Sequence, residues 1–174
     1  MHAQLTVASA AGMQALGRRL AAVLRPGDLV VLSGPLGAGK TTLVQGIGEG
    51  LRVRGPVTSP TFVIARVHPS LASGPALVHA DAYRLASPAE VDDLDLDASM
   101  ATSVTVVEWG GGLVEGLAAD RLDVSITVPA GAPDPAAAAG PDRRPRTVLL
   151  EGHGDRWVTG DSARLALDGT PEAI

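Results

Sequence analysis

The 174-residue sequence contains no cysteine, four aromatic residues and a single lysine. The absence of cysteine excludes disulfide bonds, a thiol nucleophile and cysteine-ligated metals, and it fits a reducing cytoplasm, which is the compartment we expect. The net charge of −5 and the few aromatic rings argue against direct binding of nucleic acid, which needs clustered cations and stacking surfaces. No apolar run approaches the ~20 residues of a membrane span, and the first residues do not suggest a secretory signal.

The scarcity of lysine is informative because the chain has thirteen arginines and only Lys40 as a lysine. Arginine serves wherever a general surface cation is enough, so Lys40 marks a position where the slender ammonium group is needed. The same count argues against a GTPase, because the guanine-binding signature N-K-x-D requires a second lysine.

Residues 34–41 read G-P-L-G-A-G-K-T and match the phosphate-binding pattern G-x-x-x-x-G-K-[ST]. An apolar, strand-like run at 29–32 precedes this loop and a helical pattern follows it, as the motif requires. Backbone N–H groups of such a loop wrap an anion, and the new helix contributes its positive N-terminal end. We therefore expect ATP or ADP to bind here with Mg²⁺, with Lys40 between the β- and γ-phosphates and the Thr41 hydroxyl on the metal. The expected nucleotide-binding residues are Gly34, Leu36, Gly37, Ala38, Gly39, Lys40, Thr41 and Thr42.

Two acidic residues follow short apolar strand patterns: Asp81 comes after residues 76–80 and Glu108 after residues 104–107. Near a phosphate-binding loop, a carboxylate at the end of a strand is typical of a metal ligand or of a group that orients the attacking water. The spacing does not separate these two roles. We favour Glu108 on Mg²⁺ and Asp81 near the metal or the water, which makes Lys40, Asp81 and Glu108 the candidate catalytic residues.

Three further positions are candidates for contacts. The segment 58–62, T-S-P-T-F, is either a switch segment that closes on the γ-phosphate or metal, through Ser59 and Thr61, or an ordinary proline turn. Arg84 either contacts phosphate or a partner or forms a surface ion pair. Trp109, next to Glu108, is either a packing residue or a contact.

The remaining patterns predict an α/β fold, a P-loop NTPase-like three-layer sandwich with a mixed parallel and antiparallel sheet, as one domain over residues 1–174. Helices are expected over 10–24, capped by Ser9, and from Ser87 onward, where Pro88 and Glu90 follow. Strands are expected over 29–32, 61–67, 76–80, 104–107, 122–128 and 146–151. The Pro-, Ala- and Gly-rich residues 129–145 are expected to be a flexible inserted loop, and 162–167 a short helix.

In order along the chain, the motifs G-P-L-G-A-G-K-T-T (34–42), T-S-P-T-F (58–62), H-A-D-A-Y-R-L (79–85) and V-E-W-G (107–110) resemble the TsaE (YjeE) ATPases of bacterial tRNA threonylcarbamoyladenosine biosynthesis. The resemblance covers about residues 5–128 and departs at Pro35, where the family usually has Asp. It implies Mg²⁺ on Thr41 and Glu108, a switch-like role for Ser59 and Thr61, a further acid at Asp81, and a contact to the base near Ala10.

By resemblance, the protein hydrolyses ATP slowly and does not modify tRNA itself. It would act as a switch on the threonylcarbamoyl-transferase complex of TsaB and TsaD components, and would reach tRNA only through that complex. Two alternatives stay open: a small-molecule kinase, which needs an acceptor pocket and usually a basic lid, and a nucleotide-dependent binding module whose hydrolysis is incidental.

Overall fold

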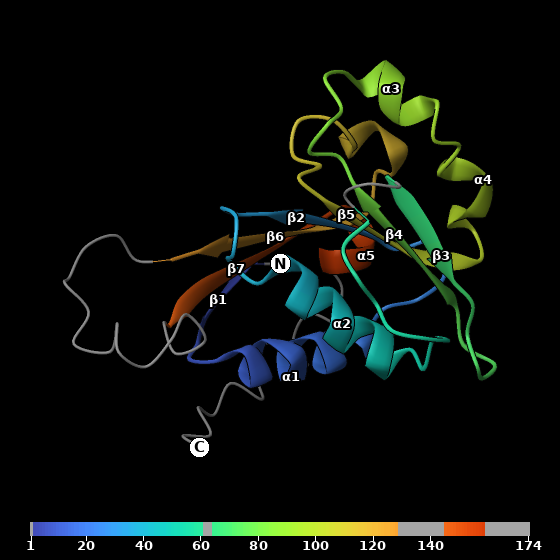
Figure 1. Cartoon of the computed structure of the whole chain (residues 1–174). Helices are drawn as coiled ribbons and strands as arrows, with labels where there is room; N and C mark the ends of the chain where they lie inside the picture. The colour runs from blue at the N-terminus through green and yellow to red at the C-terminus, as the bar shows by residue number, and fades with distance from the viewer. Residues whose placement is uncertain (1, 61–63, 129–144, 159–174) are drawn as a thin grey trace.

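The computed structural model describes residues 2–60, 64–128 and 145–158, and its strands form one mixed sheet (Figure 1). The sheet has seven strands in the order β1-β7-β6-β2-β5-β4-β3. Strand β2 pairs in parallel with β5 and β6, and β4 pairs in parallel with β5. The pairs β1–β7, β6–β7 and β3–β4 are antiparallel. The strands are β1 (His2–Val7), β2 (Leu29–Ser33), β3 (Ala65–His68), β4 (Ala76–Asp81), β5 (Ser103–Glu108), β6 (Arg121–Thr127) and β7 (Arg146–His153).

Helices cover both faces of the sheet, which confirms the predicted three-layer α/β sandwich (Figure 1). On one face lie α1 (Ala10–Ala21), α2 (Lys40–Gly50) and α5 (Asp155–Val158); on the other lie α3 (Pro88–Asp92), α4 (Asp97–Met100) and the short 3₁₀ helix η1 (Glu115–Leu117). Strand β2 contributes side chains to the hydrophobic cores on both faces of the sheet. Val30 and Leu32 pack under α1 and α2, whereas Leu29 and Val31 pack on the opposite face. This double burial is why residues 29–32 are continuously apolar.

Helices α1 and α2 approach each other closely because glycines stand at their contact. A Cβ atom at Gly46 would collide with the backbone of Gln14, and one at Gly17 would collide with the backbone of Leu43. The glycines that weaken α2 as an isolated helix therefore permit the contact that holds it in the fold.

Several predicted boundaries shift in the structure. Ser9 caps α1 by accepting a bond from Gly12 N at 3.1 Å, as predicted, but the helix ends at Ala21 rather than at 24. Ser87 caps α3, which stops after five residues. Strand β3 spans Ala65–His68, and residues 61–63 of the expected strand lie outside the described residues.

Strand β1 was not predicted, although the alternation of polar and apolar residues in its sequence is the usual signal of a strand with one face in water. The expected loop at 129–145 and helix at 162–167 lie outside the described residues, apart from Pro145. Among the helices described, none is both long enough and apolar enough to cross a membrane.

Candidate nucleotide-binding site

The glycine-rich loop connects β2 to α2 and adopts a backbone that side chains other than glycine rarely allow. Gly34, Gly37 and Gly39 have φ angles of 145°, 76° and 107°. Gly39 is also the N-cap of α2, and among the described residues no side chain caps this helix end. The first N–H groups of α2 are therefore available to an anion. The Leu36 side chain is 93% exposed, so this residue offers only its backbone to a ligand in the loop.

Lys40 points back across the loop that precedes it. Its Nζ donates to the carbonyl oxygens of Gly34 at 2.7 Å and Pro35 at 3.1 Å, and it lies 3.8 Å from the centroid of the Trp109 ring. Burial lowers the pKa of Lys40, and the nearby carboxylates of Glu108 and Asp81 oppose that shift. The only lysine of the chain is thus a largely buried cation beside the loop. A bound anion could replace the two backbone carbonyls that its ammonium group contacts.

Thr41, at the start of α2, meets Glu108, at the end of β5. Thr41 Oγ1 donates to Glu108 Oε1 at 2.8 Å, and His79 Nε2 lies 2.9 Å from the same carboxylate oxygen. Hydroxyl and carboxylate oxygens are ligands that Mg²⁺ accepts, so this pair fits the metal that the sequence implies. The described residues contain no group of three or more His, Asp or Glu side chains suited to a metal. A Mg²⁺ ion here would therefore complete its coordination with phosphate and water oxygens.

Asp81 lies beside Glu108 because the two residues are register partners in the parallel pair β4–β5. Asp81 is buried, and its Oδ1 accepts a bond from Tyr83 N at 2.9 Å. The structure therefore brings together the three candidate catalytic residues. It distinguishes the two acids by position, since the contact with the Thr41 hydroxyl comes from Glu108.

His79 belongs to this cluster but was assigned no chemistry from the sequence. It is fully buried, with Nε2 on Glu108 and with Nδ1 lacking a hydrogen-bond partner among the described residues. Strand alternation places His79 on the same face of β4 as Asp81, which is the signal that could have identified it.

Trp109 contacts Lys40 rather than serving only as packing. Its backbone lies in the left-handed region with φ 60°, and its N–H donates to Leu32 O at 2.8 Å. This turn at the end of β5 brings the half-buried indole under the ammonium group, with the Tyr83 ring 5.3 Å away. The Tyr83 ring is exposed, so the two aromatic residues form one side of the site.

The other predicted contacts lie around this cluster. Ala10 is the first residue of α1; one turn later, the Met13 side chain would lie 3.5 Å from a Cβ at Gly39, so this end of α1 adjoins the loop. Ser59 and Arg84 are exposed. Thr61 lies outside the described residues.

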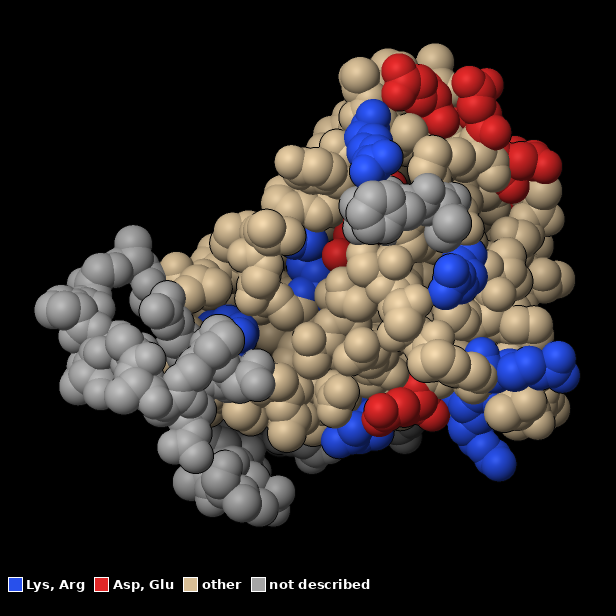
Figure 2. All heavy atoms as spheres, viewed as in Figure 1, with Lys and Arg blue, Asp and Glu red and all other residues tan. Residues whose placement is uncertain are grey.

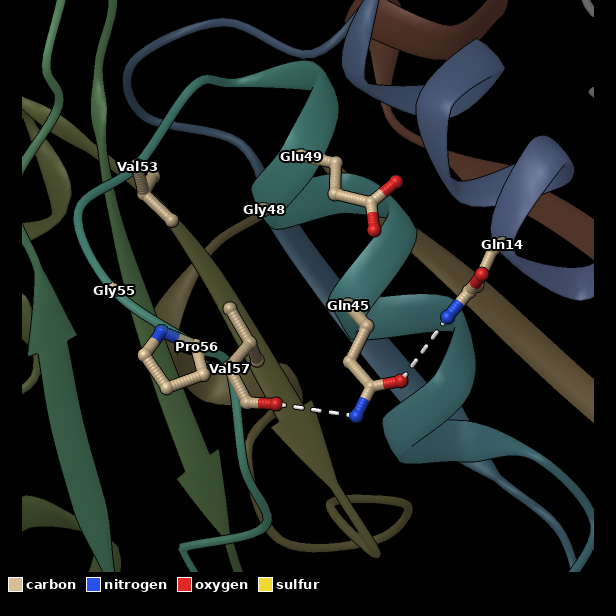
Figure 3. Close-up of a pocket in the computed structure, with 8 residues that line it drawn as sticks. All are labelled: Gln14, Gln45, Gly48, Glu49, Val53, Gly55, Pro56 and Val57. Carbon is tan, nitrogen blue, oxygen red and sulfur yellow. Dashed lines mark hydrogen bonds between the residues drawn. The ribbon is translucent and has the colours of Figure 1, made fainter.

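A cavity of about 330 Å³ lies away from the loop, between α2 and residues 53–57 (Figure 3). Gln45 of α2 points into it and donates to Val57 O at 3.2 Å, and Gln14 of α1 donates to Gln45 at 3.4 Å. These bonds tie the helix that begins at Lys40 to the segment just before Ser59.

Arg146, the first residue of β7, also reaches the loop. From the sequence it was predicted only as the first residue of a strand over 146–151. Its side chain is buried, and its Nε donates to the Ala38 carbonyl oxygen at 3.0 Å. No local pattern indicates this contact, because 108 residues separate the two partners.

Comparison with known proteins identifies the family of this chain. The family model described as "Threonylcarbamoyl adenosine biosynthesis protein TsaE" matches residues 7–132. The chain belongs to the TsaE family. The matched range of this chain spans the loop, Asp81, Glu108 and Trp109, whereas Arg146 lies beyond it.

The similar proteins carry the same description. A tRNA threonylcarbamoyladenosine biosynthesis protein TsaE of Streptomyces coelicolor is 59% identical over 155 residues, covering 88% of this chain and 99% of the relative. Its counterpart in Mycobacterium tuberculosis is 52% identical over 118 residues, covering 64% of this chain and 70% of the relative. The crystal structure of YdiB from Bacillus subtilis has a TM-score of 0.67 and 28% identity, covering 90% of this chain and 89% of that one.

Proposed function

We propose that this protein binds ATP with Mg²⁺ on the loop of residues 34–42 and hydrolyses it slowly to ADP and phosphate. The observation that carries the proposal is the contact of Thr41 Oγ1 with Glu108 Oε1 at 2.8 Å, directly beside the loop lysine. A phosphate-binding loop alone supports binding; hydrolysis needs metal-fixing and water-fixing groups from neighbouring strands. Here β4 and β5 supply such groups.

In this proposal Thr41 and Glu108 hold the metal, and His79 orients the Glu108 carboxylate. Bound Mg²⁺ would supply charge stabilisation for the phosphate oxygens. Lys40 exchanges its bonds to the Gly34 and Pro35 carbonyls for bonds to phosphate oxygens. Its lowered pKa reflects the cost of burying its charge, which bound phosphate would offset.

In this proposal Asp81 orients the attacking water; its position beside Glu108 at the same sheet edge supports the role. The segment with Ser59 and Thr61 would close on the γ-phosphate. Gln45 supports this idea, since it joins α2 to Val57 immediately before that segment. Arg84, exposed and three residues after Asp81, would contact phosphate or a partner.

We further propose that nucleotide turnover switches the threonylcarbamoyl-transferase complex of TsaB and TsaD components, and that tRNA is reached only through that complex. Acidic side chains gather over α3 and α4 (Figure 2), among them Glu90, Asp92, Asp93, Asp95 and Asp97, all exposed. Together with the net charge of −5, this surface would repel a polyanion such as tRNA. The activity would take place in the cytoplasm, where tRNA is modified.

The test is repeated threonylcarbamoyl transfer to tRNA by a purified transferase complex supplied with this protein. With ATP, product should accumulate beyond one equivalent of complex; with ADP, or with Lys40→Ala, it should stop near the first turnover. Equal product with and without ATP would contradict the switch. In the same samples, ADP and free phosphate should appear in equal amounts, whereas a phosphorylated small molecule found by mass spectrometry would indicate a kinase.

A further inference from the structure

The phosphate-binding loop rests against β7, a strand outside the part of the chain that the family model matches. Parallel strands β2 and β6 both end at the edge of the sheet where the loop begins, and Gly34 lies against the backbone of Ile126 in β6. Because β7 runs antiparallel to β6, its first residue, Arg146, stands at this same edge. The topology thus places a buried guanidinium directly behind the loop.

The contact fixes one peptide group of the loop. Arg146 Nε donates to Ala38 O at 3.0 Å, and Ala38 itself has no exposed surface. The Ala38–Gly39 peptide is trans, so the Gly39 N–H points away from the carbonyl that Arg146 holds. With the carbonyl turned toward Arg146, the N–H is turned away from it and can face an anion bound in the loop.

Side chains packed against Gly39 restrict the orientations that this peptide group can adopt. A Cβ at Gly39 would lie 3.5 Å from Met13 Cε and 3.8 Å from Arg146 Nε. Met13 from α1 and Arg146 from β7 therefore form one wall behind the glycine. Gly39, with φ 107°, needs such support because glycine can otherwise adopt many backbone conformations.

We propose that Arg146 is a positioning residue of the phosphate-binding loop, whose Nε–H holds the Ala38 carbonyl so that the Gly39 N–H faces bound phosphate. This inference rests on the proposed nucleotide binding. Arg146 acts through the backbone of the loop and does not touch the nucleotide with its charge.

Two substitutions separate the hydrogen bond from the charge. In Arg146→Gln, the side-chain Nε2 occupies the same place along the chain as the arginine Nε, so the donor is kept and the charge is lost. In Arg146→Met, the side chain still reaches the position of Nε, as in Arg146→Gln, but both donor and charge are lost. The probe is ADP with Mg²⁺, titrated by calorimetry into the full chain well below its melting temperature. The Gly39 amide signal is followed by NMR in parallel.

Arg146→Met should raise the Kd for ADP roughly tenfold, as expected when a buried carbonyl loses its donor, and should shrink the ADP-induced shift of the Gly39 amide. Arg146→Gln should stay within about threefold of the unsubstituted protein and keep that shift. If Arg146→Met does not fold, Arg146→Lys replaces it. The lysine keeps the charge but has a methylene where Nε was, so it should bind ADP more weakly than Arg146→Gln.

Arg156→Met is the matched control for stability. Arg156 is a partly buried guanidinium on the C-terminal part of the chain; it donates to Val23 O at 2.6 Å and pairs with Asp28 at 3.1 Å. Asp28 precedes β2, so this contact lies at the end of the strand opposite the loop. The control should lower the melting temperature and leave the Kd for ADP unchanged.

Two results would overturn the inference while the proposed function stands. Arg146→Met binding ADP as tightly as the unsubstituted protein would show that the bond to Ala38 does not matter. Equal losses in the Gln and Met variants, or binding by Arg146→Lys at least as tight as by Arg146→Gln, would show that the charge acts directly. Absence of ADP binding by the unsubstituted protein would instead refute the proposed function, and the inference with it.

Discussion

Thr41 Oγ1 lies 2.8 Å from Glu108 Oε1 although 67 residues separate the two along the chain. The sheet order accounts for the contact. Strand β5 lies next to β2 in parallel, so the end of β5 adjoins the loop that leaves β2. The hydroxyl and the carboxylate thus meet at the carboxyl edge of the sheet, where ligands of open α/β sheets bind.

Glu108→Gln should weaken the dependence of ATP hydrolysis on Mg²⁺. The variant keeps an oxygen that can accept from Thr41 but loses the charge that a metal needs. We expect turnover to fall at least ~100-fold and the Mg²⁺ concentration for half-maximal turnover to rise about tenfold. Phosphate release measured across a Mg²⁺ titration checks this.

The control for that experiment is Glu49→Gln, which removes an exposed carboxylate paired with Arg18 away from the loop. Its Mg²⁺ titration should match that of the unsubstituted protein. A Glu108→Gln variant with an unchanged Mg²⁺ dependence, or one that merely unfolds at lower temperature, would make the glutamate structural.

Asp81→Asn should separate hydrolysis from binding. The asparagine oxygen can still accept the bond from Tyr83 N, so the end of β4 should keep its shape. Without the carboxylate to orient water, hydrolysis should fall by about 10²–10⁴-fold, while the Kd for ATP stays within about threefold. Single-turnover rates and calorimetry on the same samples provide the measurement; parallel losses of binding and turnover would count against this role.

Nucleotide binding should change the fluorescence of Trp109. Lys40 lies over its ring at 3.8 Å and would move toward the phosphates when ATP or ADP binds. The other tryptophan, Trp157, is fully buried beneath Arg156 and should not respond. Trp157→Phe should therefore retain the emission change on adding ADP, and Trp109→Phe should lose it. The reverse assignment would show that Lys40 does not leave the indole.

Gly46→Ala should destabilise the fold, although alanine is the better helix former. The added methyl group would collide with the backbone of Gln14 at the α1–α2 contact. A cost of overpacking of ~1–3 kcal/mol or more outweighs a gain in helix propensity of about 1 kcal/mol. Thermal melting should show a lower midpoint by roughly 3–8 °C.

Gly116→Ala is the control, because a Cβ there would have no neighbour within 4 Å in the part of the chain that the structure describes. Its melting midpoint should change little. A Gly46→Ala protein that melts as high as this control would mean that α1 and α2 can separate without cost.

The centre of the fold was predictable because its signals are local. The apolar run before the loop and the glycine-rich motif predicted β2, the loop and α2. The apolar runs before Asp81 and Glu108 predicted two strands whose ends face the loop. Parallel pairing then brought the two acids together, because neighbouring parallel strands end at one edge.

The parts that sequence reasoning missed depend on contacts between distant residues. Arg146 was predicted only as the start of a strand, since nothing near it in the chain indicates Ala38. His79 was assigned no chemistry, because its partner Glu108 lies on another strand. Glycines lower the helix propensity of α2, and only the close approach of the α1 backbone to Gly46 explains why a glycine stands there.

The measurement that tests the account most directly is Mg²⁺-dependent release of phosphate from ATP by the unsubstituted protein and by Lys40→Ala. We predict slow release above the reagent blank by the unsubstituted protein and a loss of at least ~100-fold in the variant, with circular dichroism showing an intact fold in both. Equal release by the two proteins, or none above the blank from the unsubstituted one, would contradict it.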